Sequence, residues 1–196
     1  MWQKAQRFLA KDKYIGPLIK KYGPCKIKPS KRADYFLDLV DAIVSQQLSG
    51  KAAATIFGRV KKGLGGKVIP EKILSTPDTK FRGWGLSRQK TSYLKDLAQK
   101  TKKGEIKIKN LDKLPDEEVI KELVAVKGIG QWTAEMFLMF SLARPDIFPL
   151  NDLGIQKGIA KLLKKSISSQ KMAKFAERWK PYRTVASWYV WKILDS

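Results

Sequence analysis

Two glycines, Gly128 and Gly130, interrupt an apolar stretch that otherwise has the pattern of continuous helix. Glycine permits positive φ angles and lets the backbone approach another group closely, so this Gly-Ile-Gly sequence predicts a tight turn between two helices. The second helix begins near Gln131, and the first N–H groups of a helix have no partner within it. Together with the helix dipole, such amides suit a phosphate group. The stretch therefore predicts a hairpin of two helices that binds a phosphate backbone.

The charge of the chain favours a polyanionic partner. It carries 40 Lys and Arg against 18 Asp and Glu, a formal net charge of +22, and the basic residues are spread along its whole length. This excess indicates nucleic acid before a membrane surface, although a lysine-rich proteome gives the same composition. A hydrophobic content of 43% indicates a globular protein rather than a disordered basic tail.

Rare and missing side chains limit the chemistry. The chain has one Cys, Cys25, and no His. These residues provide no internal disulfide, thiolate zinc site, four-Cys iron–sulfur cluster, or Ser-His or Cys-His nucleophile pair. Acid–base chemistry must then come from carboxylates, Lys or Tyr. No apolar run approaches the ~18 residues of a membrane span and the N-terminus has no signal-peptide pattern, so we expect an intracellular protein.

Helical periodicity covers most of the chain, and no segment has a convincing strand pattern, so we expect an all-α fold. The clearest helix begins near Asp34, with an apolar face formed by Phe36, Leu37, Val40, Ile43, Val44 and Leu48. Other helices are expected within residues 2–22, 52–60, 71–74, 87–102, 115–126 and 152–165, from Ser168 or Ser169 toward Trp179, and from about Pro181. Residues 61–70 and 102–114 are expected to be loops.

Two short segments of the first half carry candidate binding residues. Gln46 and Gln47 end the helix that begins near Asp34. The simplest interpretation is a solvated helix end, and the alternative is an uncharged amide that enters a stack of bases without an ion-desolvation cost. Arg88 and Lys90 lie in the first turn of their helix, where cations oppose the helix dipole, and a nearby phosphate would compensate.

The second half offers a lone carboxylate and a group of aromatic residues. Asp152 follows a proline-marked loop and stands at the start of a helix, a pattern typical of an N-cap. Its place after the hairpin also suits an acid that acts on what the hairpin holds, and both roles are compatible. Trp188, Tyr189 and Trp191 lie within one helical turn, so one of them is a candidate for lining a cleft.

Five segments resemble the helix-hairpin-helix DNA glycosylase superfamily and, within it, the 3-methyladenine DNA glycosylase II family. They are SQQLS (45–49), GLSRQK (85–90), VKGIGQWTA (126–134), FPLNDLGI (148–155) and WKPYR with YVW (179–191). The resemblance implies one helix-hairpin-helix glycosylase domain over residues 1–196, a minimal form without the N-terminal β-domain of some members. Its two helical lobes, with the active-site cleft between them, would be about residues 35–145 and about 1–34 plus 146–196.

The resemblance also implies roles for single residues. Asp152 would be the essential aspartate of the superfamily. Gln47 falls about where the family inserts a side chain into the gap left by a flipped nucleotide, with Gln46 and Leu48 as alternatives. The expected DNA contacts are Lys127, Gly128, Gly130, Gln131, Thr133, Arg88 and Lys90. A structural Na⁺ or K⁺ at the hairpin would be held by the backbone carbonyls of Val124, Val126 and Ile129.

The implied activity is that of a monofunctional glycosylase of base excision repair. Bifunctional members carry a Lys nucleophile where this chain has Trp132, so neither a Schiff base nor AP-lyase activity is expected. Water would hydrolyse the N-glycosidic bond of flipped-out alkylated purines, of the 3-methyladenine and 7-methylguanine type, while Asp152 stabilises an oxocarbenium-like transition state. Trp132 and Trp191 are the candidates for an aromatic base pocket. No other cofactor is expected, and no iron–sulfur cluster.

The expected partner is double-stranded DNA containing damaged bases, bound by a monomer in the nucleoid-associated cytoplasm or in a nucleus, and not a membrane. Two alternatives stay open. A non-enzymatic protein that recognises DNA structure would use Asp152 only for stability. A glycosylase for neutral damaged bases would need polar contacts to the edge of the base.

Overall fold

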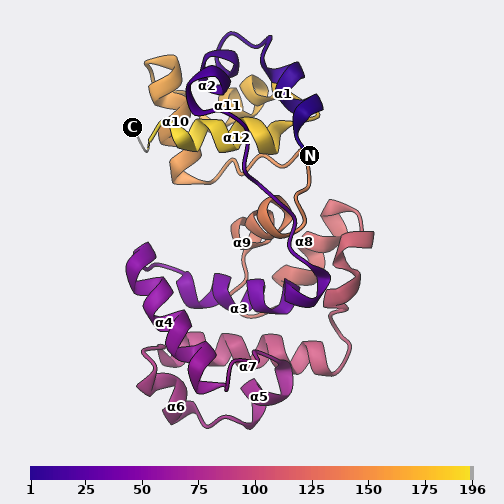
Figure 1. The fold of residues 1–196 in the computed structure, drawn as a ribbon, viewed down its shortest axis with the longest axis vertical. Helices are drawn as coiled ribbons and strands as arrows, with labels where there is room; N and C mark the ends of the chain where they lie inside the picture. Colours follow the sequence, from indigo (N-terminus) through magenta and orange to yellow (C-terminus); the bar gives the residue numbers. More distant parts are fainter. Residues whose placement is uncertain (195–196) are drawn as a thin grey trace. The chain divides into compact units, whose positions relative to one another are not determined.

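The computed structural model describes residues 1–194, and these contain helices and no strand (Figure 1). The prediction of an all-α protein is confirmed. Within the described residues, no helix combines the length and the apolar character needed to cross a bilayer. The chain divides into two compact units: a central unit, Ser30–Phe137, and a terminal unit made of Met1–Pro29 and the segment from Leu138 onward.

The central unit is built on α3 and α7, which pack against each other and against α4, α5, α6 and η2. Its elements are η1 (Arg32–Asp34), α3 (Tyr35–Ser45), α4 (Gly50–Gly63), α5 (Pro70–Ser75), α6 (Asp78–Gly83), α7 (Arg88–Lys102), η2 (Ile108–Lys113), α8 (Asp116–Val124) and α9 (Gln131–Met136).

The terminal unit joins both ends of the chain, because α2 and α10 both pack against α12. Its elements are α1 (Gln3–Leu9), α2 (Ile15–Tyr22), α10 (Leu153–Leu163), α11 (Ser169–Ala176), η4 (Glu177–Trp179) and α12 (Arg183–Lys192). A π-helical turn, η3 (Phe137–Ser141), continues α9 across the boundary of the two units.

The core of the central unit follows from helical periodicity on α3 and α7. Val40 and Ile43 of α3 and Leu94 and Leu97 of α7 have no exposed surface. The expected apolar face of α3 is correct at Phe36, Val40, Ile43 and Val44. Leu37 is only half-buried, and the fully buried Leu39 was not predicted. The helix stops at Ser45, so Leu48 lies beyond it and is 37% exposed.

The core of the terminal unit is aromatic. Trp179 and Tyr189 are fully buried, and the Tyr189 hydroxyl donates to the Gly23 carbonyl at 2.8 Å while accepting from the Gln6 amide at 3.1 Å. Burial raises the pKa of Tyr189 to about 12; the charge of Cys25 adds to the increase, whereas the hydrogen bonds with Gln6 and with the Cys25 backbone oppose it. The Tyr189 hydroxyl is therefore a neutral structural group near pH 7.

Several boundaries differ from those expected from the sequence. α4 extends through Gly63, so the glycine-rich segment 61–70 begins as helix, and the Lys72 ammonium donates to the Leu64 carbonyl at 2.6 Å just after that helix ends. The expected loop 102–114 contains η2, and α6 was not predicted. α12 begins at Arg183, two residues after Pro181. Local composition did not reveal α6 and η2, which pack against α7 and α3 respectively.

Two glycines of α4 provide a matched test of packing. A Cβ added at Gly63 would lie 2.1 Å from Cζ2 of Trp84, whereas one added at Gly58 would meet nothing within 4 Å. We expect Gly63→Ala to lower the free energy of unfolding by about 1–3 kcal/mol through overpacking. Gly58→Ala should raise it by about 0.5–1 kcal/mol, because alanine favours the helix. Urea denaturation measures both, and equal effects would contradict the packing of Trp84.

Candidate functional site

The predicted hairpin lies between α8 and α9. Gly128 has φ +81°, as a turn glycine requires, whereas Gly130 is the extended N-cap of α9 with φ −93°. Val126 and Ile129 are buried at 1% and 4% exposure, which anchors the turn in the central core. Only one of the two glycines therefore needs a positive φ.

Gly128 also lies flat against an aromatic ring. A Cβ added there would be 2.0 Å from Cδ2 of Tyr93, a residue of α7. No side chain fits between this turn and the ring. The backbone of the hairpin and the Tyr93 side chain are thus in direct contact, and α7 sets the position of the turn.

Asp96 of α7 holds the next residue of the hairpin. Its Oδ2 accepts from the Lys127 backbone amide at 2.9 Å and from the Lys100 ammonium at 2.6 Å. Burial acts to raise the pKa of Asp96, but the hydrogen bonds from Lys100 and Lys127 and their charges outweigh it and lower the pKa. Asp96 was not singled out from the sequence. It stays charged at neutral pH and holds the hairpin to α7 through the Lys127 amide.

The expected DNA contacts in and just before the first turn of α9 differ in their exposure to solvent. Trp132 is 45% exposed, whereas Thr133 is only 5% exposed, so its side chain belongs to the interior of the central unit. The Gln131 side chain donates to Glu135 Oε1 at 3.0 Å, one turn further along the helix. Lys127 is exposed at the tip of the turn. The indole of Trp132 is therefore the largest accessible side chain of this turn.

Arg88 and Lys90 were both expected to lie near a phosphate, but the structure gives them different environments. Arg88 is exposed in the first turn of α7. The Lys90 ammonium instead donates to the carbonyls of Val44 at 2.7 Å and Gln46 at 2.6 Å, at the C-terminal end of α3. Burial lowers the pKa of Lys90. These carbonyls, rather than an external phosphate, provide the partners of its ammonium in the free protein.

A pocket of about 660 Å³ lies within the central unit, between the turn after α3 and the hairpin. Its lining consists of Ala42, Ser45, Gln46, Gln47, Leu48, Ser87, Gln89, Lys90, Tyr93, Gly128, Trp132, Thr133 and Met136. Among the three wedge candidates, Gln47 and Leu48 are exposed, and Gln47 has φ +57°. Gln46 is half-buried, and its amide donates to the Gly128 carbonyl at 2.8 Å.

Asp152 lies in the terminal unit as the N-cap of α10. Its Oδ1 accepts from the Ile155 backbone amide at 2.7 Å, which confirms the predicted capping role. The same oxygen accepts from the indole N–H of Trp191 at 2.8 Å. The carboxylate is therefore oriented by two donors, one from α10 itself and one from α12.

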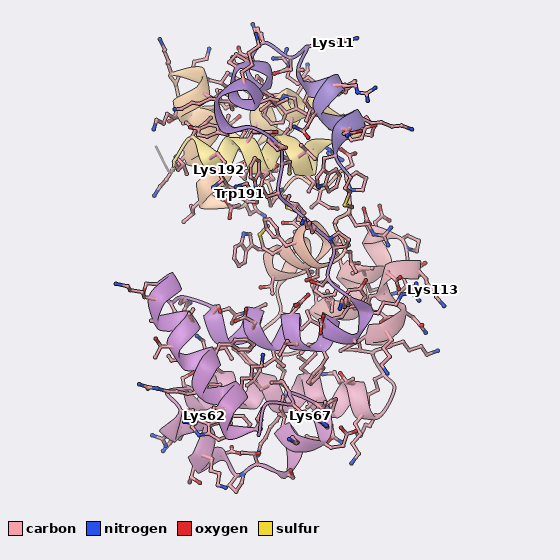
Figure 2. All side chains as sticks on the ribbon, viewed as in Figure 1. Lys11, Lys62, Lys67, Lys113, Trp191 and Lys192 are labelled. Atoms are coloured by element: carbon pink, nitrogen blue, oxygen red, sulfur yellow. The ribbon has the colours of Figure 1, made fainter. Side chains whose placement is uncertain are left out.

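Trp191 can reach Asp152 because residue 154 is a glycine. A Cβ at Gly154 would be 2.8 Å from Nε1 of Trp191 and 2.9 Å from Oδ1 of Asp152. The other side of the indole faces Phe140, with ring centroids 5.8 Å apart and planes inclined by 33°. Trp191, expected in a base pocket, thus has its N–H directed to the carboxylate, and Figure 2 labels it on α12.

The loop that leads to Asp152 is tied to α12 by an ion pair. Arg183 Nε donates to Asp146 Oδ1 at 2.8 Å, and its Nη2 donates to Oδ2 at 2.9 Å. The hydroxyl of Thr184, fully buried, accepts from the Ile147 amide at 2.9 Å. The bidentate ion pair between Arg183 and Asp146 has fixed geometry. The sequence does not indicate this ion pair, because its two residues lie 37 positions apart.

The described residues contain no cluster of three or more His, Cys, Asp or Glu side chains that could hold a metal ion. Backbone oxygens are a separate case. The Val126 carbonyl accepts from the Ile129 amide at 3.1 Å and keeps one lone pair for a second ligand. Within residues 1–194, no backbone amide donates to the carbonyls of Val124 or Ile129. These three oxygens have the chemistry that a hard monovalent cation requires.

Comparisons with known proteins agree with this arrangement. Residues 40–182 match the family described as HhH-GPD superfamily base excision DNA repair protein, and the chain belongs to this superfamily. DNA-3-methyladenine glycosylase 1 of Schizosaccharomyces pombe is 38% identical over 185 residues, which cover 92% of this chain and 80% of that protein. The resemblance stated from the sequence is confirmed.

Solved structures extend the similarity to the fold. The 3-methyladenine DNA glycosylase of Schizosaccharomyces pombe in complex with abasic DNA has a TM-score of 0.88 at 36% identity, covering 99% of this chain and 98% of that one. A DNA-3-methyladenine glycosidase from Bacillus halodurans has a TM-score of 0.85 at 36% identity, covering 97% of this chain and 88% of that one. The helix-hairpin-helix glycosylase fold is thereby confirmed.

The hairpin glycines provide a second matched test. Gly128→Ala would combine a positive φ with the contact to Tyr93, and we expect it to lower the free energy of unfolding by about 2–4 kcal/mol. Gly130→Ala, with a negative φ and nothing within 4 Å of its added Cβ, should cost less than about 1 kcal/mol, as an N-cap replacement. Urea denaturation of both variants gives the comparison. Similar losses would show that the contact with Tyr93 does not define the hairpin.

Proposed function

We propose that this protein is a DNA glycosylase of base excision repair, specific for alkylated purines. One observation supports it most directly: Asp152 of a chain in the HhH-GPD superfamily is oriented by two donors, Ile155 N–H and Trp191 N–H. The names of its relatives, which act as 3-methyladenine DNA glycosylases, indicate the substrate class. The enzyme works on chromosomal DNA, in a nucleoid or a nucleus.

Binding to DNA is proposed to be electrostatic and independent of sequence. The net charge is +22, and lysines are exposed on the central unit, such as Lys62, Lys67 and Lys113 (Figure 2). Contacts of this kind with phosphates supply affinity without reading bases. The hairpin adds backbone amides and Lys127 at one phosphate.

The chemistry requires a carboxylate more than a general acid. A purine alkylated on a ring nitrogen carries positive charge and is already a good leaving group. As its bond to the sugar breaks, the sugar becomes oxocarbenium-like, and a fixed carboxylate stabilises that charge. Asp152 is proposed to do this and to orient the attacking water, after the nucleotide has been flipped out of the duplex.

The enzyme is proposed to be monofunctional and of the glycosylase II type. Trp132 occupies the position where bifunctional relatives carry a Lys, and an indole cannot form a Schiff base. Its exposed ring instead supports a role in stacking on a flipped, cationic base, to which cation–π attraction adds selectivity.

A Na⁺ or K⁺ ion is proposed at the hairpin. The backbone carbonyls of Val124, Val126 and Ile129 would hold it, and the ion would supply positive charge toward a DNA phosphate. Those residues would position the backbone, and the ion takes no part in breaking the glycosidic bond.

Replacing one oxygen of the carboxylate tests the proposal. Asn caps a helix as well as Asp does, so Asp152→Asn should unfold at the same urea concentration as the wild type. Release of 3-methyladenine and 7-methylguanine from methylated duplex DNA should fall at least about 100-fold, as when one electrostatic stabiliser is removed. Affinity for the duplex should stay within about twofold, because DNA binding depends on phosphate contacts elsewhere.

Other results separate the alternatives. Duplex binding without base release by the wild type, on alkylated, deaminated and oxidised DNA alike, would contradict the glycosylase and favour a protein that recognises DNA structure. Release of only deaminated or oxidised bases would move the substrate class to neutral lesions. Borohydride trapping of a covalent enzyme–DNA adduct would contradict the monofunctional mechanism.

The indole N–H of Trp191 can be tested apart from its ring. Trp191→Phe retains an aromatic ring and removes the donor to Asp152, and hydrogen bonds to charged groups contribute about 1.5–3 kcal/mol. We expect the single-turnover rate of base release to fall about 10- to 100-fold. Trp188→Phe, on the same helix but bonded to no atom of Asp152 in the described residues, is the matched control. Equal rates for the two variants would contradict the orienting role.

A further inference from the structure

The turn after α3 is joined to the hairpin by one side chain. The Gln46 amide nitrogen donates to the Gly128 carbonyl at 2.8 Å. Gly128 is the residue of the hairpin that has a positive φ and lies against Tyr93. The bond therefore reaches the residue at which the hairpin contacts Tyr93 of α7, across 82 positions of sequence.

The backbone of Gln46 is held as well. Its carbonyl accepts from the Lys90 ammonium at 2.6 Å, and the Leu48 amide closes the turn on the Ser45 carbonyl at 3.2 Å. Ser49 then caps α4 by accepting from the Ala52 amide. The turn is thus fixed at its beginning and at its end.

Between these fixed points only the tip, Gln47 and Leu48, faces solvent. Gln47 adopts φ +57°, a left-handed conformation that costs energy for a residue with a Cβ. Leu48 is 37% exposed although it is apolar. An exposed tip that contains one strained residue and is held at both ends is suited to insertion between base pairs. Gln46 ties this tip to the hairpin, which is proposed to bind phosphate.

We propose that Gln46 is a positioning residue that links the Gln47–Leu48 tip to the hairpin turn at Gly128, so that backbone binding and insertion into the duplex occur as one unit. This inference rests on the proposed function, since insertion matters only if the protein flips nucleotides. Errors of about 1 Å in the position of such a group cost about 100-fold in rate. Gln46 therefore acts on base flipping and leaves general affinity for DNA unchanged.

The chemistry of the bond indicates which substitutions separate its roles. Gln46→Met retains the length and volume of the side chain and removes the donor. Gln46→Asn retains the amide but is one methylene shorter. Gln99→Met, at an exposed position of α7, makes the same change of side chain outside the site.

The experiment measures three quantities on each variant. They are affinity for undamaged duplex by fluorescence anisotropy, unstacking beside a lesion by 2-aminopurine fluorescence, and the single-turnover rate of base release. For Gln46→Met and Gln46→Asn we expect affinity within twofold of wild type, with unstacking and release reduced at least 10-fold, in proteins of unchanged melting temperature. Gln99→Met should match wild type in all three.

A triple variant distinguishes support of the tip from an independent contact. If Gln46 acts through the tip, Gln46→Met with Gln47→Ala and Leu48→Ala is no slower than the variant that lacks only the tip side chains. The inference would be overturned if the loss of rate from Gln46→Met multiplied the loss from the tip substitutions. It would also be overturned if Gln46→Met unstacked DNA within twofold of wild type, or if its affinity for undamaged duplex fell as much as its unstacking. Wild-type unstacking without base release would contradict the glycosylase, while the unstacking data would still decide the role of Gln46.

Discussion

The contact between Gly128 and the Tyr93 ring is the constraint on which the candidate DNA-binding surface depends. With the turn placed against α7, Asp96 can hold the Lys127 amide and Gln46 can bind the Gly128 carbonyl. Each of these bonds is modest by itself, since a typical net contribution is about 0.5–1.5 kcal/mol. Together they hold three segments that are far apart in sequence against one another: the hairpin, α7 and the turn after α3.

The position of Asp152 is also fixed by more than one contact. A capping carboxylate is held by its own helix, and here the Trp191 indole adds a second donor to the same oxygen. In catalysis by electrostatic preorganisation, the useful property of a charge is that it need not reorient during the reaction. The bonds that begin α10 therefore also orient the carboxylate that is proposed for catalysis.

What could be predicted from the sequence was local. The Gly-Ile-Gly turn and the Asp152 cap depend on residues at most three positions apart, and both were correctly predicted. The partners of Lys90 and Arg183 lie 44 and 37 positions away, and no local pattern indicates them. Lys90 was therefore interpreted as a phosphate ligand, although the carbonyls of Val44 and Gln46 already accept its hydrogen bonds.

The missing side chain at Gly154 has a consequence for how this site can change in evolution. Any substitution there would occupy the space through which the Trp191 indole reaches Asp152. Positions 154 and 191 therefore form a coupled pair: a larger residue at 154 becomes tolerable only after the tryptophan has been replaced by a smaller side chain. A lineage that takes this route loses the indole N–H that donates to the carboxylate.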